Sequence, residues 1–153
     1  MQHQVPAPDT IIRSATPADA AAVLSLWRAA AIPSGVSDTR EGLATLLDAD
    51  RQALLVAESE SSVIGSLIAA WDGWRGSFYR LAVHPSRRRE GIATALVREG
   101  ERRLHERGAL RLTAIVADDE KLALDFWQAA GYERQPHRAR FLRHLSRDAA
   151  RLG

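Results

Sequence analysis

The feature that most constrains the fold is a series of three strand-like runs between residues 53 and 84, each separated from the next by a short turn. The runs are Ala53–Ser59, Val63–Trp71 and Ser77–His84, and the turns between them are polar or rich in glycine. Runs joined this closely form hairpins, because antiparallel strands need only a few residues to reverse direction. The sequence therefore predicts an antiparallel meander.

Helical patterns and further strands surround this meander. A strand at 10–15 precedes a helix that Thr16 caps and that has Pro17 at its first position. The remaining predicted elements are a weaker helix at 39–47, a helix at 91–107, a strand at 110–117, a helix at 118–132 and a last strand at 138–145. Gly100 lies on the apolar stripe of the 91–107 helix, which indicates close packing on the sheet. Together these elements predict an α/β fold with a mixed, mostly antiparallel sheet and helices on both faces.

Length and composition favour one domain over residues 10–148, preceded by a flexible tail at 1–9. The 153 residues are 46% hydrophobic and 26% charged, which is typical of globular domains. The absence of cysteine excludes disulfides and thiolate chemistry. The histidines lack metal-ligand spacing, so no metal is predicted. No apolar segment is long enough to span a bilayer, and we expect a cytoplasmic protein without membrane contact.

Three consecutive arginines, Arg87–Arg89, join the last strand of the meander to the helix that starts near Gly91. The first N–H groups of a helix have no intrahelical partner, and the helix dipole adds roughly half a positive charge there. The junction is therefore a candidate anion site, at which Gly91 lets a ligand approach the backbone closely. A solvated basic loop and a nucleic-acid contact are the alternatives. The net charge of only +2 and the lack of an aromatic platform argue against nucleic acid.

Residues 88–93 read Arg-Arg-Glu-Gly-Ile-Ala and resemble the signature [RQ]-x-x-G-x-[GA] of the GNAT (general N-acetyltransferase) superfamily. The preceding "LAVHP", the opening "IIRSATPADAAAVLSLW" and the closing "FWQAAGY" are also similar to that family, so the resemblance covers roughly residues 10–145. It implies the GNAT fold, with a bulge that separates the fourth and fifth strands and leaves a V-shaped cleft. It also implies acetyl-CoA as cosubstrate, with its pyrophosphate on the backbone of 88–94 and its pantetheine arm paired with the fourth strand. The cofactor-binding residues implied in this way are Leu81, Ala82, Val83, Arg88, Arg89, Glu90, Gly91, Ile92, Ala93 and Thr94.

The resemblance implies transfer of an acetyl group to a primary amine of a small-molecule or peptide acceptor. An alkyl amine has a pKa near ~10.4, so a base or a desolvating site must supply its neutral form. Two positions that the resemblance expects to contact the cofactor differ from the family. Trp127 stands where the family often has a tyrosine that donates a proton to the thiolate. Glu120 stands where the family often has an asparagine. Strand 77–83 carries no carboxylate. A non-catalytic acyl-CoA-binding domain is therefore the alternative, and a homodimer is compatible with family habit.

The sequence also indicates residues that would contact the acceptor. Tyr79 is expected to share a face with Leu81 and Val83 and to point into the cleft as the candidate catalytic group, the alternative being a core side chain. The candidate substrate contacts are Trp27, Trp71, Asp72 and Trp74. For Trp27 the alternative is a core anchor, and for Asp72 an ordinary turn residue.

Overall fold

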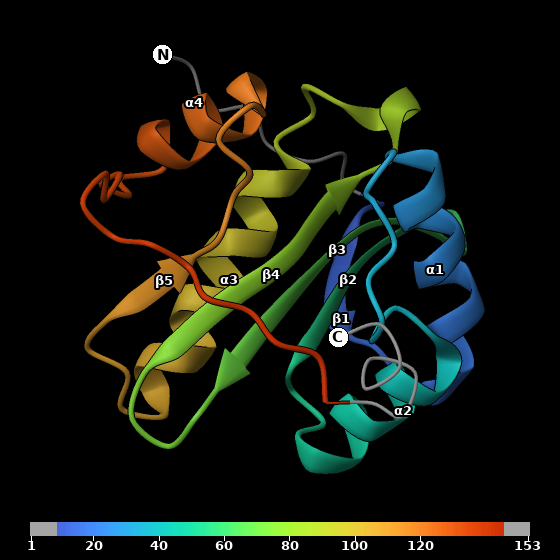
Figure 1. Cartoon of the computed structure of the whole chain (residues 1–153). Helices are drawn as coiled ribbons and strands as arrows, with labels where there is room; N and C mark the ends of the chain where they lie inside the picture. The colour runs from blue at the N-terminus through green and yellow to red at the C-terminus, as the bar shows by residue number, and fades with distance from the viewer. Residues whose placement is uncertain (1–8, 146–153) are drawn as a thin grey trace. The chain divides into compact units, whose positions relative to one another are not determined.

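The computed structural model describes residues 9–145, and its central element is a five-stranded sheet (Figure 1). The strands lie side by side in chain order: β1 (Ile11–Ser14), β2 (Leu54–Ser59), β3 (Ser62–Trp71), β4 (Gly76–Val83) and β5 (Leu112–Ala114). Neighbours from β1 to β4 are antiparallel. β5 is parallel to β4 because helix α3 (Ile92–Glu106) carries the chain back across the sheet. The predicted meander and mixed sheet are confirmed.

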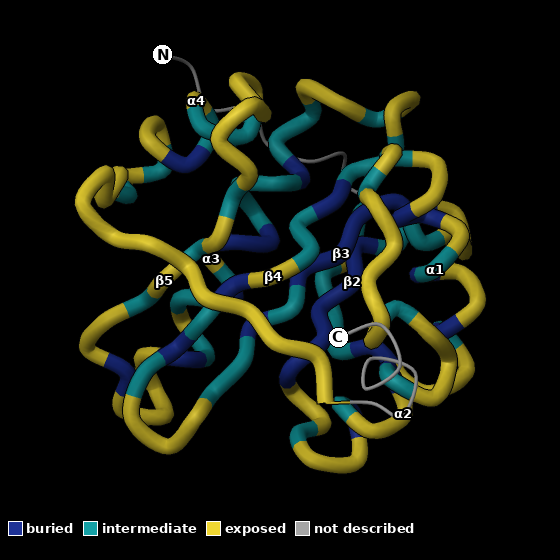
Figure 2. The backbone as a smooth tube through the Cα atoms, in the orientation of Figure 1, coloured by how far each residue is buried: buried dark blue, intermediate teal, exposed yellow. Residues whose placement is uncertain are grey.

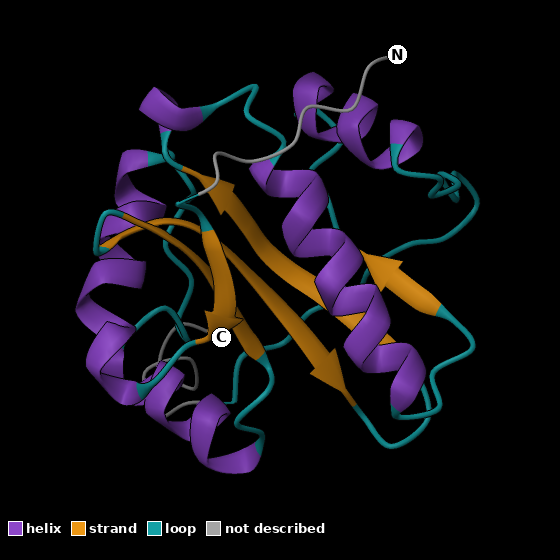
Figure 3. Ribbon diagram, turned by 180° about the vertical axis from the view of Figure 1, so that it is seen from behind, coloured by secondary structure: helices purple, strands orange, loops and turns teal. Residues whose placement is uncertain are grey.

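Helices cover both faces of the sheet (Figure 3). On one face lie α1 (Ala20–Ala29), which follows a 3-10 turn η1 (Pro17–Asp19), and α2 (Arg40–Ala49). Their apolar cluster with the sheet includes Val23, Leu26, Trp27, Leu43, Leu47, Leu54, Val56 and Ala82. On the other face α3 packs through Gly100, where an added Cβ would lie 2.7 Å from Cε1 of Phe78. The predicted close approach at Gly100 is confirmed.

The buried residues concentrate in the central strands (Figure 2). Residues 54–57 of β2 and 64–67 of β3 are all buried. Continuous burial of this kind is expected for strands that are covered on both faces, since successive side chains point in opposite directions.

The described residues fall into two compact units, the first ending at Ile115 and the second beginning at Val116. The first unit contains the sheet and helices α1 to α3, and the second contains α4 (Lys121–Ala129). Within residues 9–145 we find no helix with both the length and the apolar character needed to cross a bilayer. The predicted tail at 1–9 lies outside the described residues except for Asp9, as do residues 146–148 of the predicted domain.

The predicted last strand at 138–145 was wrong, because this segment has no regular structure. Its side chains Phe141 and Leu145 are 96% and 87% exposed. A strand here would bury too little apolar surface to offset the entropy lost by ordering the backbone. β5 is likewise shorter than the predicted strand at 110–117, and both Leu110 and Ile115 beside it are exposed.

Candidate active site

A bulge interrupts β4. The register with β3 shifts between Ser66 and Ile68, where Arg80 and Leu81 of β4 both lie opposite Leu67 of β3. Arg80 has a φ of +55°, in the left-handed region that residues with a side chain rarely adopt. An additional residue with a distorted backbone is the mark of a β-bulge, which bends its strand and increases the local twist. The bulge that the family resemblance implies is therefore present in the fourth strand.

β4 and β5 pair at one end only. The pairing joins residues 76–78 to the whole of β5 and stops there. From Tyr79 to Val83 this edge of β4 has no strand partner among the described residues. The expected separation of the fourth and fifth strands thus begins after Phe78, and it leaves backbone N–H and C=O groups available for pairing with a ligand.

The bulge also changes which face of the sheet each side chain occupies. Tyr79 pairs with Ile68, which packs against the α1 and α2 cluster. Val83 pairs with Gly65, where an added Cβ would meet the first turn of α3 on the other face. Cross-strand partners share a face, so the expectation that Tyr79 and Val83 share one is wrong. The physical reason is the additional residue between them, which shifts the period-two alternation by one position.

Trp27 lies in the core beneath the bulge. Its indole is 3% exposed, and its Nε1–H donates to Oγ of Ser66 at 2.8 Å. Oγ of Ser66 in turn donates to the backbone carbonyl of Arg80 at 3.2 Å. This candidate substrate contact is therefore enclosed, and its N–H supports the bulge. Sequence reasoning missed Ser66 and Arg80, although a serine inside an apolar central strand was an available signal.

A row of backbone N–H groups follows β4 at the start of α3. Among the described residues, the N–H groups of Arg89 and of residues 91–94 have no hydrogen-bond acceptor in the protein, whereas those of Arg88 and Glu90 close the 3-10 helix Pro85–Arg87 and the turn at 88–89. Arg89 and Gly91 have φ values of +66° and +79°, and Gly91 is the N-cap of α3. Left-handed residues within such a loop turn successive N–H groups toward a common side, which is the geometry of an anion-binding nest. This backbone is compatible with the predicted anion site, which stays a prediction.

The side chains of this loop divide into two kinds. Arg87 donates through Nε to the Glu90 carboxylate, at 2.9 Å to Oε2, and through Nη1 to Oγ of Ser59 at 3.2 Å. The bonds to Glu90 raise the pKa of Arg87. Arg88 and Arg89 are exposed and form no ion pair with any described residue. The Arg87–Glu90 pair therefore closes the loop, and the guanidinium groups of Arg88 and Arg89 remain available to an anion.

The β3–β4 hairpin holds the candidate substrate residues Trp71, Asp72 and Trp74. Oδ1 of Asp72 accepts the N–H of Arg75 at 2.6 Å and that of Trp74 at 2.8 Å, and these bonds lower the pKa of Asp72. Trp74 is 68% exposed, with the guanidinium of Arg75 3.9 Å from its ring centroid. A strand rises about 3.3 Å per residue, so the full length of β4 separates this hairpin from the N–H row.

The second unit contains the two positions that differ from the family pattern. Glu120 is the N-cap of α4 and is exposed. Trp127 is 8% exposed and makes edge-on contacts with Phe126 and Tyr132, at centroid distances of 5.5 and 4.9 Å. The indole is thus part of an aromatic group formed by α4 and the residues after it. A contact of Glu120 or Trp127 with a cofactor stays a prediction.

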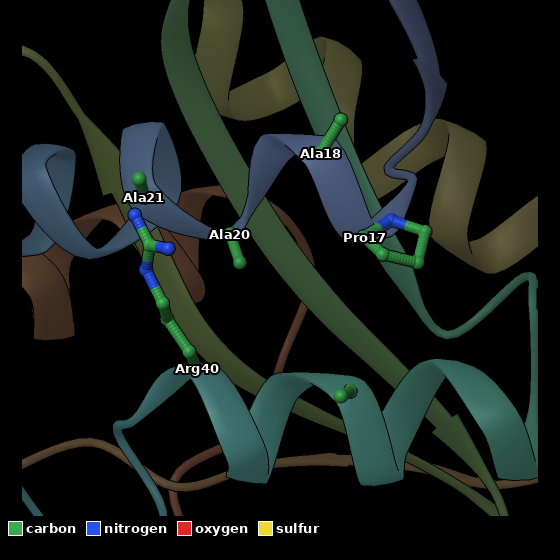
Figure 4. A pocket seen from close by; sticks show the side chains of 6 residues that line it. Pro17, Ala18, Ala20, Ala21 and Arg40 are labelled. Carbon is green, nitrogen blue, oxygen red and sulfur yellow. The ribbon is translucent and has the colours of Figure 1, made fainter.

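The predicted site residues line neither of two hollows in the first unit. A hollow of about 300 Å³ between α1 and α2 is lined by Pro17, Ala18, Ala20, Ala21, Arg40 and Ala44 (Figure 4). In Figure 4 the side chain of Arg40 extends from α2 toward Ala21 of α1. A second hollow, of about 370 Å³, is bordered by Arg13, Asp19 and His84. The candidate site is instead a strand edge that continues into a loop of N–H groups.

Comparisons with known proteins agree with this geometry. The family model described as the acetyltransferase (GNAT) family matches residues 21–132, which include the bulge and the N–H row. An acetyltransferase of Yersinia pestis (strain Pestoides F) is 33% identical over 113 residues, which are 74% of this chain and 80% of that protein.

Solved structures of similar fold include complexes with coenzyme A or acetyl-CoA. The PaiA N-acetyltransferase of Thermoplasma acidophilum, in complex with coenzyme A, gives a TM-score of 0.72 at 17% identity, covering 82% of this chain and 91% of that one. A GNAT family acetyltransferase of Brucella melitensis, in complex with acetyl-CoA, gives a TM-score of 0.55 at 29% identity, covering 75% of this chain and 80% of that one. The family match over most of the chain and the Yersinia relative agree with this fold, and the chain belongs to the GNAT acetyltransferase family.

Proposed function

We propose that the chain transfers the acetyl group of acetyl-CoA to a primary amine. The observation that carries the proposal is that the unpartnered edge of β4 leads directly into the N–H row at residues 88–94. A ligand that suits both features has an extended arm with amide groups at one end and a diphosphate at the other. Acetyl-CoA has these two parts in this order.

The backbone supplies most of the proposed binding. The pantetheine amides pair with the edge of β4 at Leu81, Ala82 and Val83, where side chains matter less than N–H and C=O groups. The diphosphate accepts the N–H groups of Arg89 and of residues 91–94, and Arg88 and Arg89 add charge. Glu90 is held by Arg87 and Ile92 is buried in the core, so both serve the shape of the loop, whereas the small side chain of Ala93 leaves room for the ligand.

The proposed reaction is a direct attack by the neutral amine on the thioester carbonyl. The nitrogen forms a bond to the carbonyl carbon, the carbon–sulfur bond breaks, and the sulfur leaves with the electron pair as thiolate. The attacking nitrogen loses a proton to a base or to water. A thiolate with a pKa near ~8.5 leaves without strong acid catalysis, so an indole at Trp127 is compatible with turnover.

Tyr79 is the proposed polar group near the reacting atoms. It lies at the point where β4 leaves β5, it is 41% exposed, and its hydroxyl can donate or accept a hydrogen bond. β4 contains no Asp or Glu, so the neutral amine must arise by desolvation, by water or with help from this hydroxyl. The acceptor contacts assigned to Trp71, Asp72 and Trp74 remain part of the proposal.

The test is thiol release from acetyl-CoA with a broad panel of amines, including amino acids, polyamines, aminoglycosides and peptide N-termini. We expect steady turnover with at least one class and background hydrolysis with the others. The second candidate function, a non-catalytic acyl-CoA-binding domain, is favoured by the lack of a carboxylate on β4 and by Trp127. Tight binding of CoA with no turnover on any acceptor would replace our proposal with that function.

A further inference from the structure

Arg80 joins the bulge of β4 to the α1–α2 loop, residues 30–39. Its guanidinium forms two parallel bonds with the Asp38 carboxylate, from Nε to Oδ1 at 3.1 Å and from Nη2 to Oδ2 at 2.7 Å. The Asp38 side chain is largely buried in this pair. A two-point bond between a planar guanidinium and a carboxylate fixes orientation as well as distance. The loop is therefore held in one position against the strand.

The loop is built around this ion pair. The N–H of Gly35 donates to Oδ2 of Asp38 at 2.6 Å, and the N–H of Asp38 donates to the carbonyl of Gly35 at 3.1 Å. A Cβ at Gly35 would lie 3.1 Å from Nη2 of Arg80, so the turn at 35–38 passes directly over the guanidinium. The path of this turn depends on where Arg80 lies.

The backbone of Arg80 is held independently of its side chain. Its carbonyl accepts the hydrogen bond from Ser66, which is itself bonded to Trp27 of α1. The guanidinium lies 5.8 Å from the centroid of the Trp27 ring. One residue with a left-handed backbone thus connects α1, the bulge and the α1–α2 loop.

We propose that the Arg80–Asp38 pair is a latch that couples the order of the α1–α2 loop to the bulge of β4, with Arg80 as a positioning residue for the transfer reaction. This inference rests on the proposed function, because the acceptor must reach a thioester bound where β4 leaves β5. Tyr79 precedes Arg80 and lies on the face that α1 and α2 cover. Release of the loop therefore changes the surroundings of the acceptor and leaves the N–H row at 88–94 in place.

The experiment compares Arg80→Gly and Asp38→Asn with a matched control. Glycine tolerates the left-handed φ and so preserves the bulge while removing the guanidinium. Asparagine keeps the shape of Asp38 and removes its charge. The control is Asp50→Asn, since the Asp50 carboxylate also accepts one guanidinium, from Arg107 at 2.7 Å, and one backbone N–H, from Gln52 at 2.9 Å, at the other end of α2.

The first readout is amide hydrogen exchange, which needs no turnover. We expect exchange across residues 33–39 to accelerate about ten-fold in both latch variants, because a charge-assisted bond that closes the loop is lost. Exchange in this segment is expected to be unchanged in Asp50→Asn. The double variant R80G/D38N is expected to exchange no faster than either single variant, because both changes remove the same interaction.

The second readout is kinetic. With acetyl-CoA and the best amine of the panel, we expect the KM for the amine to rise about five-fold in the latch variants while the Kd for acetyl-CoA stays within about two-fold. Arg80→Lys keeps the charge without the two-point geometry and is expected to be intermediate. Circular dichroism confirms that each variant is folded.

The possible failures are distinguishable. Exchange rates at 33–39 that are the same in Arg80→Gly and Asp38→Asn as in the wild type would overturn the latch. A double variant whose exchange rate rises by the product of the two single effects would also overturn it. Faster exchange with an unchanged KM for the amine would overturn the positioning role. No turnover by the wild type on any amine would overturn the proposed function, and hydrogen exchange would still decide whether the latch exists.

Discussion

Three residues between 80 and 91 have a left-handed backbone, and only Gly91 among them is a glycine. For Arg80 and Arg89 this conformation costs on the order of 1–3 kcal/mol each, so other interactions must offset it. At Arg80 the bond from Ser66 and the ion pair with Asp38 do so. Strain of this kind is found where a chain needs an unusual backbone for binding or catalysis, and here it brackets the proposed acetyl-CoA surface.

Replacement of Gly91 by valine is expected to weaken acetyl-CoA binding. A β-branched residue at a φ of +79° is strained and distorts the N–H row, so we expect the Kd to rise about ten-fold or more. Isothermal titration calorimetry checks this. Gly73→Val is the matched control, because Gly73 has a φ of +93° with open space around its Cβ at the hairpin tip. Equal affinity of the two variants would place the phosphate site elsewhere.

The Asp19 carboxylate makes stability depend on pH. Its bonds with Arg13, at 2.8 and 2.9 Å, and with the Thr16 N–H lower its pKa from 3.8 to about 2. A lowered pKa in the folded state stabilises the protein above about pH 4, and this contribution is lost as the pH falls toward about 2. We expect Asp19→Asn to reduce the free energy of unfolding by about 2 kcal/mol at neutral pH, and by much less near pH 2.5.

Urea unfolding at several pH values measures this difference. Asp125→Asn is the control, since the pair of Asp125 with Lys121 is exposed on both sides and such pairs contribute about 0–1 kcal/mol. A destabilisation by Asp19→Asn that does not change with pH would contradict the assignment and would indicate lost packing instead.

At the level of elements, α3 is placed by a residue without a side chain. Glycine to alanine usually stabilises a helix by up to about 1 kcal/mol. At Gly100 the added Cβ would lie 2.7 Å from Phe78 and 3.3 Å from Leu67, so we expect Gly100→Ala to destabilise the fold by about 1 kcal/mol or more. Thermal unfolding tests this. In the double variant Gly100→Ala/Phe78→Leu the smaller leucine makes room for the added Cβ, so part of the lost stability should be recovered. A rise in Tm for the single variant would show that the helix can move away.

The elements were more predictable from the sequence than the relations between them. The meander and helices α1 to α4 were predicted because periodicity, caps and turn residues are local signals. The strand at 138–145 was wrongly predicted, since an apolar run does not reveal whether a partner strand is within reach. The face of Tyr79 was missed because one additional residue in β4 reverses the alternation, and no local pattern marks a bulge at residues 80–81.

In the candidate site, too, the parts that are local in the sequence were predictable and the long-range contacts were not. The N–H row at 88–94 follows from a strand, a basic loop and Gly91, all of which are close in the sequence. The contacts beneath it are not local: Trp27 reaches Ser66 across 39 positions, and Asp38 reaches Arg80 across 42. Such pairs depend on how α1 and its loop lie on the sheet, which single-sequence patterns do not contain.

At the scale of the whole molecule, one connection creates both halves of the proposed binding surface. The crossover through α3 makes β5 parallel to β4, and it also places the start of α3 just beyond the end of β4. The unpartnered strand edge and the N–H row therefore come from the same change of direction. Substitutions that alter only side chains on this surface are expected to matter less than those that alter its backbone.

Because the strands of the sheet lie in chain order, β2, β3 and β4 pair across short loops, and their assembly loses little chain entropy. β2, β3 and β4 are separated only by residues 60–61 and 72–75, whereas β1 must close the chain across residues 15–53 to pair with β2. Loop-closure entropy grows only with the logarithm of loop length. The hairpins that form the bulge therefore lose the least chain entropy, and the outer connections can lengthen at a small cost in free energy.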